Sequence, residues 1–157
     1  MDPQRIAGVG YSSGAHLVSL LATVNSSNHP DRAPWNPDQP GLVAVVAGGL
    51  PADLRTFDSG RLLKQFLGGT HEAMPERYER ASPAAWVTAD TPPHFLFHGT
   101  WDDLVPVSQA RDFRQRLEAA GVDNQLLLMR GQGHVTTFLL RGAVMEEALR
   151  FLQTHTR

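Results

Sequence analysis

A serine flanked by glycines lies near the beginning of the chain, in the sequence Gly10-Tyr11-Ser12-Ser13-Gly14. The pattern G-x-S-x-G is typical of a sharp turn between a strand and a helix, and this turn exposes the central hydroxyl. Ser12 is therefore the candidate nucleophile. The backbone N–H of Ser13, at the expected start of the helix, is the candidate donor to an oxyanion. The alternative is a polar turn in which either serine caps the helix.

A serine hydroxyl is a weak nucleophile at neutral pH, so it needs a base and a group that orients the base. Asp102 and Asp103 follow an apolar run and precede Pro106, and either carboxylate could accept the imidazole N–H. Each could instead be a solvated loop acid or a helix cap. His134 follows Gly131-Gln132-Gly133, where the glycines allow the loop to fold inward. It is the candidate general base, with a capping or loop histidine as the alternative.

The other histidines show no pattern that predicts catalysis, and no pair has a spacing typical of metal ligands. The absence of cysteine excludes thiolate chemistry and Cys-ligated zinc. We therefore expect neither a metal nor a cofactor. We expect His98 at the end of its strand and His16 and His94 flanking or facing the core. His29, His71 and His155 are expected in polar loops or at the terminus.

Short apolar runs alternate with helical patterns along the chain. We expect strands at 5–10, 42–47, 94–98 and 125–129, and helices at 15–24, 106–120 and 135–154. A loop rich in proline is expected at 25–41. This alternation predicts an α/β fold, a mostly parallel sheet with helices on both faces. Because active groups collect at the carboxyl ends of parallel strands, the three candidate loops are expected at one rim.

The segment 50–93 shows no strand pattern, and it is expected to be a helical insert, or cap-like segment, within a single domain spanning 1–157. Short helices are expected at 61–67 and 75–80. The insert would cover the site, with Phe57 and Trp86 as candidate apolar lining or as ordinary packing. Candidate core residues of the downstream helices are Phe113, Leu117, Ala120, Phe138, Val144, Met145, Ala148, Leu149 and Phe151.

The composition is that of an ordinary globular domain. The 157 residues carry a formal charge of −2 and are 41% hydrophobic, so electrostatics does not favour nucleic acid or an anionic membrane as a partner. No apolar run approaches the ~18 residues of a membrane span. The first ten residues lack the pattern of a secretory signal, and the expected location is the cytoplasm.

These motifs together resemble the α/β-hydrolase fold, and within it the esterase/lipase branch, which includes carboxylesterases, feruloyl-esterase-like proteins and arylformamidase-like enzymes. The resemblance is carried by the serine motif, by 98–106 (His-Gly-Thr-Trp-Asp-Asp-Leu-Val-Pro) and by Gly133-His134. It implies a triad of Ser12, Asp102 and His134. In this branch the acid lies three residues after Gly99, which selects Asp102. The implied activity is hydrolysis of small-molecule carboxylic esters through an acyl-enzyme.

The serine motif begins within ten residues of Met1, whereas family members have several strands and a second oxyanion donor before it. The resemblance therefore implies a carboxyl-terminal half that lacks the amino-terminal strands. The strand Arg5 to Gly10 would become an edge, and a second copy of the chain or a complementary half could cover it. Two alternative functions are a non-catalytic or partner-dependent remnant and a peptidase of the prolyl-oligopeptidase type.

Overall fold

The structure is a computed structural model that describes residues 2, 4–32, 41–57 and 60–156. Residues 33–40, which belong to the loop expected at 25–41, lie outside the described residues. The described part of that loop contains one short 3-10 helix, Pro30–Arg32.

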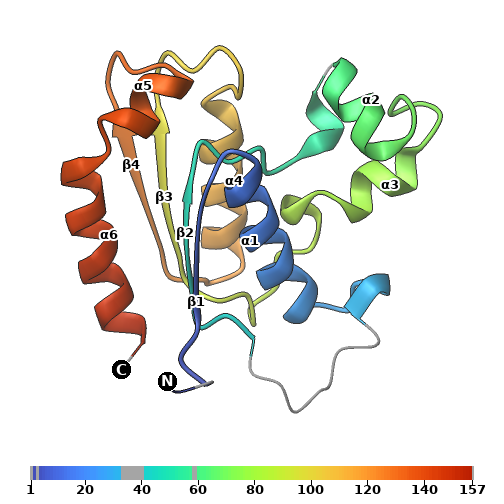
Figure 1. Cartoon of the computed structure of the whole chain (residues 1–157). Helices are drawn as coiled ribbons and strands as arrows, with labels where there is room; N and C mark the ends of the chain where they lie inside the picture. Colours follow the sequence, from blue (N-terminus) through green and yellow to red (C-terminus); the bar gives the residue numbers. More distant parts are fainter. Residues whose placement is uncertain (1, 3, 33–40, 58–59, 157) are drawn as a thin grey trace.

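The sheet has four parallel strands in the order β1-β2-β3-β4 (Figure 1). They are β1 (Ala7–Tyr11), β2 (Ala44–Gly48), β3 (His94–Gly99) and β4 (Asn124–Met129). Each lies within two residues of its predicted bounds. The predicted parallel α/β fold is confirmed, with β1 and β4 as its two edges.

Successive side chains of a strand enter the two apolar layers on opposite faces of the sheet, which explains the continuous hydrophobic runs. In β2, Val45 and Ala47 join one buried cluster, whereas Ala44 and Val46 join the other. All five residues of this strand are buried. A strand covered on both faces has no polar side to expose, so its sequence does not alternate.

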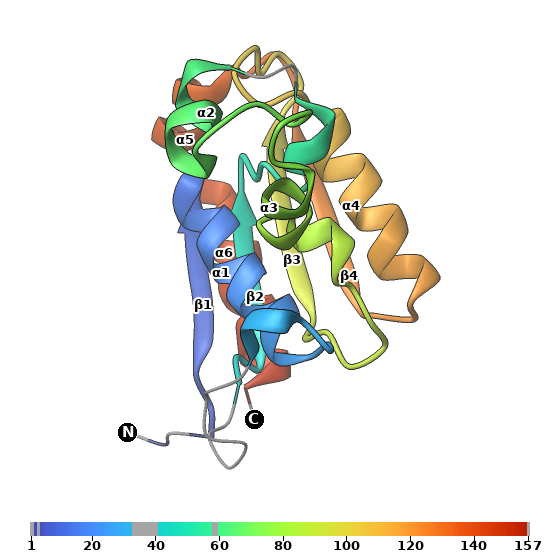
Figure 2. The ribbon, with the colours of Figure 1, turned by 90° about the vertical axis from the view of Figure 1, so that its right-hand side faces the viewer.

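Helices cover both faces of the sheet, with α1 and α4 in front and α6 behind in the view of Figure 2. Their bounds are α1 (Ser13–Asn25), α4 (Ser108–Ala119) and α6 (Gly142–His155). Phe113 and Leu117 of α4 are fully buried, as predicted, and Ala120 packs beside them. The helix begins two residues after Pro106 rather than at it, and Pro106 accepts the N–H of Gln109.

The single helix predicted at 135–154 is wrong, because two helices occupy the segment. The first, α5 (His134–Leu139), lies at the rim of the sheet, and α6 packs along its face. The break lies at Leu140 and Arg141, where the Arg141 guanidinium sits 3.9 Å from the centre of the Phe138 ring. Glycine at the start of α6 disfavours a continuous helix.

Two residues predicted in the core of that helix are exposed instead. Phe138 turns away with α5 and is 41% exposed, and Leu149 lies on the outer flank of α6 at 58%. Val144, Ala148 and Phe151 are buried as predicted.

The segment between β2 and β3 contains α2 (Arg61–Leu67), α3 (Pro75–Arg80) and 3-10 turns at Leu54–Thr56 and Pro83–Ala85. No strand occurs in its described residues, 50–57 and 60–93. It has a small core around Tyr78, against which Phe57 packs. His16 of α1 bonds the carbonyl of Ala81 at 2.6 Å and fixes this segment to the main fold. Whether the segment acts as a cap stays a prediction.

His29 lies in a loop, as predicted, and is buried there. Its side chain is buried, its Nε2 lies 2.9 Å from the Arg80 carbonyl, and its ring contacts Trp86. Trp86 also donates to the Glu79 carbonyl at 3.0 Å. The contacts that Trp86 makes are therefore those of ordinary packing.

Acid is expected to destabilise the fold through His94, which lies fully buried in β3 against Phe113. Burial lowers the pKa of His94 from 6.5 to about 4. The unfolded chain therefore takes up this proton at a higher pH than the native chain, and the free energy of unfolding falls as pH decreases from about 6.5 towards 4. The His94 contribution is about 2 kcal/mol between pH 7 and pH 5.

Urea unfolding at the two pH values measures this loss, and His94→Leu is expected to show a shallower dependence than the wild type. Burial also lowers the pKa values of His16 and His98, so the variant would keep a pH dependence of the same sign from these two residues. Equal slopes in both proteins would contradict the assignment to His94.

Candidate active site

Ser12 occupies a strained turn between β1 and α1. Its backbone has φ 55° and ψ −121°, and it is the one non-glycine residue with positive φ in the described part of the chain. Its N–H donates to the Gly48 carbonyl at 2.8 Å, which ties the turn to the end of β2. Such strain is typical of a serine that a fold presents for reaction.

The first glycine of the serine motif is required by close packing. A Cβ at Gly10 would lie 2.3 Å from the carbonyl group of Gly14, so a larger residue would push α1 away from the strand. At Gly14 a Cβ would meet no atom within 4 Å. Close packing therefore requires glycine at position 10 but not at position 14.

The structure brings Ser12, His134 and Asp102 into one hydrogen-bonded row. The Ser12 Oγ lies 2.9 Å from Nε2 of His134, and Nδ1 of the same ring lies 2.6 Å from Oδ2 of Asp102. The Asp102 carboxylate is fully buried and the His134 side chain is 11% exposed. The geometry assigns the imidazole proton to Nδ1, where it is donated to Asp102, and leaves Nε2 to accept the serine proton.

The loop after β3 positions Asp102 and excludes Asp103. Oδ1 of Asp102 accepts the backbone N–H groups of Leu104 and Val105 at 3.1 and 2.8 Å, so the carboxylate closes its own turn. Asp103 points outward and is exposed. Of the two candidate acids, only Asp102 reaches the histidine.

The loops that carry the acid and the histidine are bonded to each other. Thr100 Oγ1 accepts the N–H of Gly131 at 2.9 Å, and Trp101 donates its N–H to the Gln132 carbonyl at 2.9 Å. A Cβ at Gly99 would lie 2.2 Å from that same carbonyl oxygen, so glycine is needed there. These contacts hold His134 beside Asp102.

Ser13 is the first residue of α1 and is exposed at the rim. The N–H groups of the first helical turn have no acceptor within the helix, so the N–H of Ser13 is available to a ligand beside Ser12. This placement agrees with the predicted oxyanion donor, and its role stays a prediction.

Sequence reasoning missed Tyr11 and Gly49, which lie against His134. The Tyr11 hydroxyl donates to the His134 backbone carbonyl at 2.6 Å, and the two rings lie 5.1 Å apart. Gly49 has φ 55°, and a Cβ there would lie 3.0 Å from Cε1 of His134. The position of Gly49 directly after a predicted strand, at the same rim, was the available signal.

His98 lies behind Asp102 and was correctly predicted to pack at the end of its strand. Its side chain is fully buried, with Nε2 2.8 Å from the Val105 carbonyl and 3.4 Å from Oδ2 of Asp102. Burial lowers the pKa of His98, so the ring is neutral near pH 7 and its Nε2–H is the donor. His98 and Asp102 thus hold the two backbone groups of Val105.

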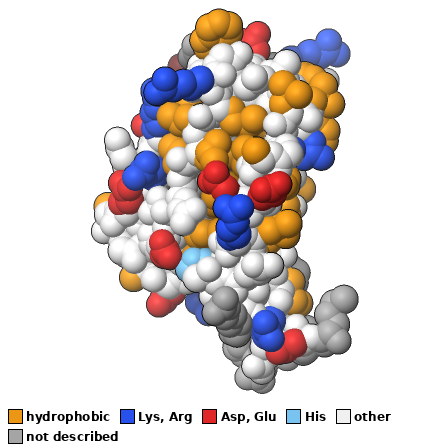
Figure 3. Space-filling model, turned by 90° about the vertical axis from the view of Figure 1, so that its left-hand side faces the viewer, with side chains coloured by type: hydrophobic (Ala, Val, Ile, Leu, Met, Phe, Trp, Pro, Cys, Tyr) orange, Lys and Arg blue, Asp and Glu red, His pale blue; other side chains and the backbone are white. Residues whose placement is uncertain are grey.

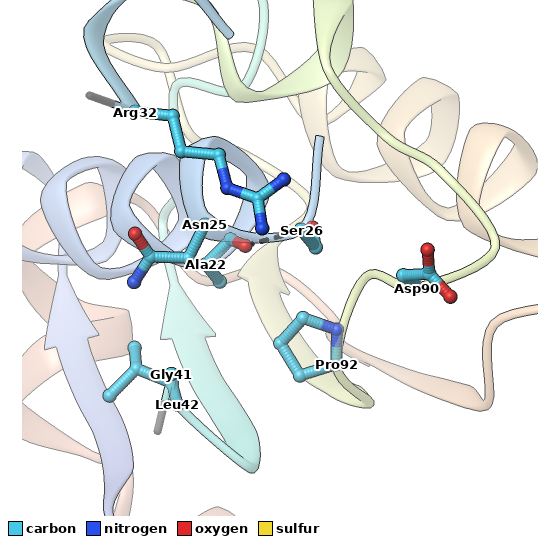
Figure 4. Close-up of a pocket in the computed structure, with 8 residues that line it drawn as sticks. All are labelled: Ala22, Asn25, Ser26, Arg32, Gly41, Leu42, Asp90 and Pro92. Atoms are coloured by element: carbon cyan, nitrogen blue, oxygen red, sulfur yellow. Dashed lines mark hydrogen bonds between the residues drawn. The ribbon is translucent and has the colours of Figure 1, made fainter. Parts of the chain in front are cut away.

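A polar pocket of about 380 Å³ lies at the opposite end of the strands (Figure 4). Arg32 and Asp90 border it, together with Leu42 just before β2 and Pro92 just before β3. Since Ser12 lies at the carboxyl ends of the strands, this pocket is not part of the triad site. Among the described residues, no group of three or more histidine or acidic side chains could hold a metal ion.

Solved structures share this fold. The chain superposes on a truncated carbohydrate esterase from gut microbiota with a TM-score of 0.86 at 20% identity, covering 99% of this chain and 61% of that one. The apo form of esterase 2 from Thermogutta terrifontis gives 0.75 at 27% identity, covering 98% and 57%. The parallel sheet with its serine turn is the α/β-hydrolase fold of these esterases.

Residues 1–117 match the model of one protein family, BD-FAE, and the chain belongs to that family. Similar curated proteins include a probable isoprenylcysteine alpha-carbonyl methylesterase of Arabidopsis thaliana, 27% identical over 92% of this chain. Another is the probable carboxylic ester hydrolase LipM of Mycobacterium tuberculosis, 36% identical over 74%. The chain spans 34% and 28% of the lengths of these two relatives. No helix among the described residues has the length and apolar character needed to cross a bilayer.

Proposed function

We propose that this chain hydrolyses carboxylic esters of small molecules through an acyl-enzyme. The observation that carries the proposal is the unbroken row from the Ser12 hydroxyl to Nε2 of His134 and from Nδ1 to Asp102. Relatives named as esterases support esters over peptides as the substrate class.

In the first half of the reaction, Ser12 Oγ attacks the ester carbonyl carbon while its proton moves to Nε2 of His134. Asp102 stabilises the imidazolium that forms, and the Ser13 N–H donates to the oxyanion. The C–O bond to the alcohol then breaks, and Nε2 gives its proton to the departing alkoxide. Ser12 is left acylated and His134 neutral.

In the second half, water takes the place of the alcohol. His134 removes a proton from this water as it attacks the acyl carbon, and the bond to Ser12 Oγ breaks. The proton on Nε2 returns to the serine oxygen, and the carboxylic acid leaves.

The proposal is tested with a fluorophosphonate probe and with p-nitrophenyl acetate. Folded protein is expected to be labelled at Ser12 and to release nitrophenolate, while protein unfolded in urea is expected to do neither, because the serine needs the assembled row. Peptide mapping locates the label. Absence of labelling and of turnover in folded protein would reject a serine hydrolase, and labelling at another serine would reject this site.

A second candidate is a hydrolase that needs a partner to be fully active, and the exposed edge of β1 favours it. Val9, in the middle of this strand, is 58% exposed, and Figure 3 shows apolar side chains over much of the face on the side of α6. An uncovered edge strand is a template for another strand. Only one oxyanion donor, Ser13, is identified, and loss of one donor typically lowers kcat about 10²- to 10³-fold.

We propose that a complementary segment, rather than a second copy, covers this edge, because the similar solved chains contain the whole of this fold and are longer. The chain alone is therefore expected to sediment as a 17.2 kDa monomer with low turnover. If the chain sediments as a dimer and Val9→Lys converts it to a monomer, a second copy covers the edge of β1 instead. Leu62→Lys, at an apolar position on α2 that is 75% exposed, is the matched control.

A further inference from the structure

Tyr11 lies where the nucleophile and the base meet. It is the last residue of β1, directly before Ser12, and its hydroxyl donates to the backbone carbonyl of His134 at 2.6 Å. Its ring packs 5.8 Å from Phe97 and 5.2 Å from Phe138. One side chain therefore links the serine turn to the histidine loop, which is 123 residues away in sequence.

The Tyr11 hydroxyl does not belong to the proton relay. It contacts the backbone of His134, whereas the ring of that residue exchanges protons with Ser12. Burial, with Asp102 nearby, raises the pKa of Tyr11 to about 12. The hydroxyl consequently remains protonated, and able to donate, at neutral and moderately alkaline pH.

The histidine loop needs such an anchor. His134 is the first residue of a helix only six residues long, and glycines at 131 and 133 precede it, with φ 71° at the first. The bonds from Thr100 and Trp101 hold the loop at Gly131 and Gln132, before the histidine. The Tyr11 hydroxyl acts at His134 itself.

We propose that Tyr11 is a positioning residue that holds the imidazole of His134 in line with Ser12 Oγ. This inference rests on the proposed function of the triad. Because Tyr11 and Ser12 are adjacent, any shift of the serine turn is transmitted to the histidine, and the distance between Oγ and Nε2 is kept. Misplacement of a reacting group by about 1 Å can cost about 10²-fold in rate.

Tyr11→Phe tests the proposal, because it removes one oxygen and keeps the ring contacts. We expect kcat for p-nitrophenyl acetate to fall between about 10- and 10²-fold with KM nearly unchanged. In protein labelled with ¹⁵N-histidine, we expect the ring nitrogen shifts of His134 to change from a single tautomer, with the proton on Nδ1, to a mixture.

Tyr78→Phe is the matched control. This is the other tyrosine of the chain, it is fully buried, and its hydroxyl also donates to a backbone carbonyl, that of Gly69 at 3.1 Å. It belongs to the small core of the segment between β2 and β3. Both variants are expected to lower Tm by comparable amounts, but only Tyr11→Phe is expected to change kcat and the His134 shifts.

Equal kcat values for the two variants, or unchanged His134 shifts in Tyr11→Phe, would overturn the proposal. If the wild type neither turns over ester nor reacts with the fluorophosphonate, the proposed function fails, and the ¹⁵N shifts then decide on Tyr11 alone. A change confined to Tyr11→Phe upholds the positioning role in that case, and identical spectra for all three proteins reject it.

Discussion

Ser12→Ala is expected to reduce ester hydrolysis to the background rate, a loss of up to about 10⁶-fold in kcat. In the proposed mechanism the Ser12 hydroxyl forms the acyl-enzyme, whereas His134 and Asp102 activate it. Initial rates with p-nitrophenyl acetate measure the loss. Circular dichroism checks the fold, since alanine must adopt the same positive φ as the serine.

Ser13→Ala is the control for this change. It removes the neighbouring hydroxyl but keeps the backbone N–H that is assigned to the oxyanion, so kcat is expected to stay within about threefold of the wild type. If Ser12→Ala retained about a hundredth or more of the wild-type rate, hydrolysis would not pass through an acylated Ser12. A large loss in Ser13→Ala would give the side chain of Ser13 a role that the proposed mechanism lacks.

The sheet was predictable because its strands are short apolar runs with clear ends. Val45 to Ala47 could not alternate, since both faces of β2 are covered, and Gly48 and Gly49 end the run. Parallel strands place their following loops at one rim, so Ser12, Asp102 and His134 could be grouped before any coordinates were known.

The break between α5 and α6 was less visible, because apolar residues continue through it. Phe138 was expected on the buried face of one long helix, and Leu139 and Leu140 continue the apolar run, but all three are exposed. Tertiary contacts decide where these residues lie. The carbonyl of His134 and the ring of Phe138 contact Tyr11, so α5 stays at the rim while α6 turns to pack on the sheet.

Contacts between distant loops could not be predicted from the sequence either. The need for glycine at position 49 arises from the rings of Tyr11 and His134, which come from the first and last parts of the fold. His98 was expected at a strand end, but its bond to Val105, and thereby its place behind Asp102, depends on how the loop turns.

Asp102→Asn is the second substitution for which we expect a large loss of kcat, because of the way the loop after β3 holds the carboxylate. The two backbone N–H groups of Leu104 and Val105 fix an oxygen at the Oδ1 position, so the asparagine amide nitrogen must occupy the place of Oδ2. It would then donate to Nδ1 of His134, which forces the ring proton onto Nε2. Nε2 would point its own hydrogen at Ser12 and could not accept the serine proton.

We therefore expect kcat to fall about 10⁴-fold in Asp102→Asn while the structure is preserved. Asp103→Asn is the matched control, since this neighbouring carboxylate is exposed and does not reach the histidine; its kcat is expected to match the wild type. The ¹⁵N shifts of His134 check the cause, because only Asp102→Asn is expected to move the proton to Nε2. A full rate in Asp102→Asn would show that the tautomer of His134 does not limit hydrolysis, and the role of Asp102 in the mechanism would have to be abandoned.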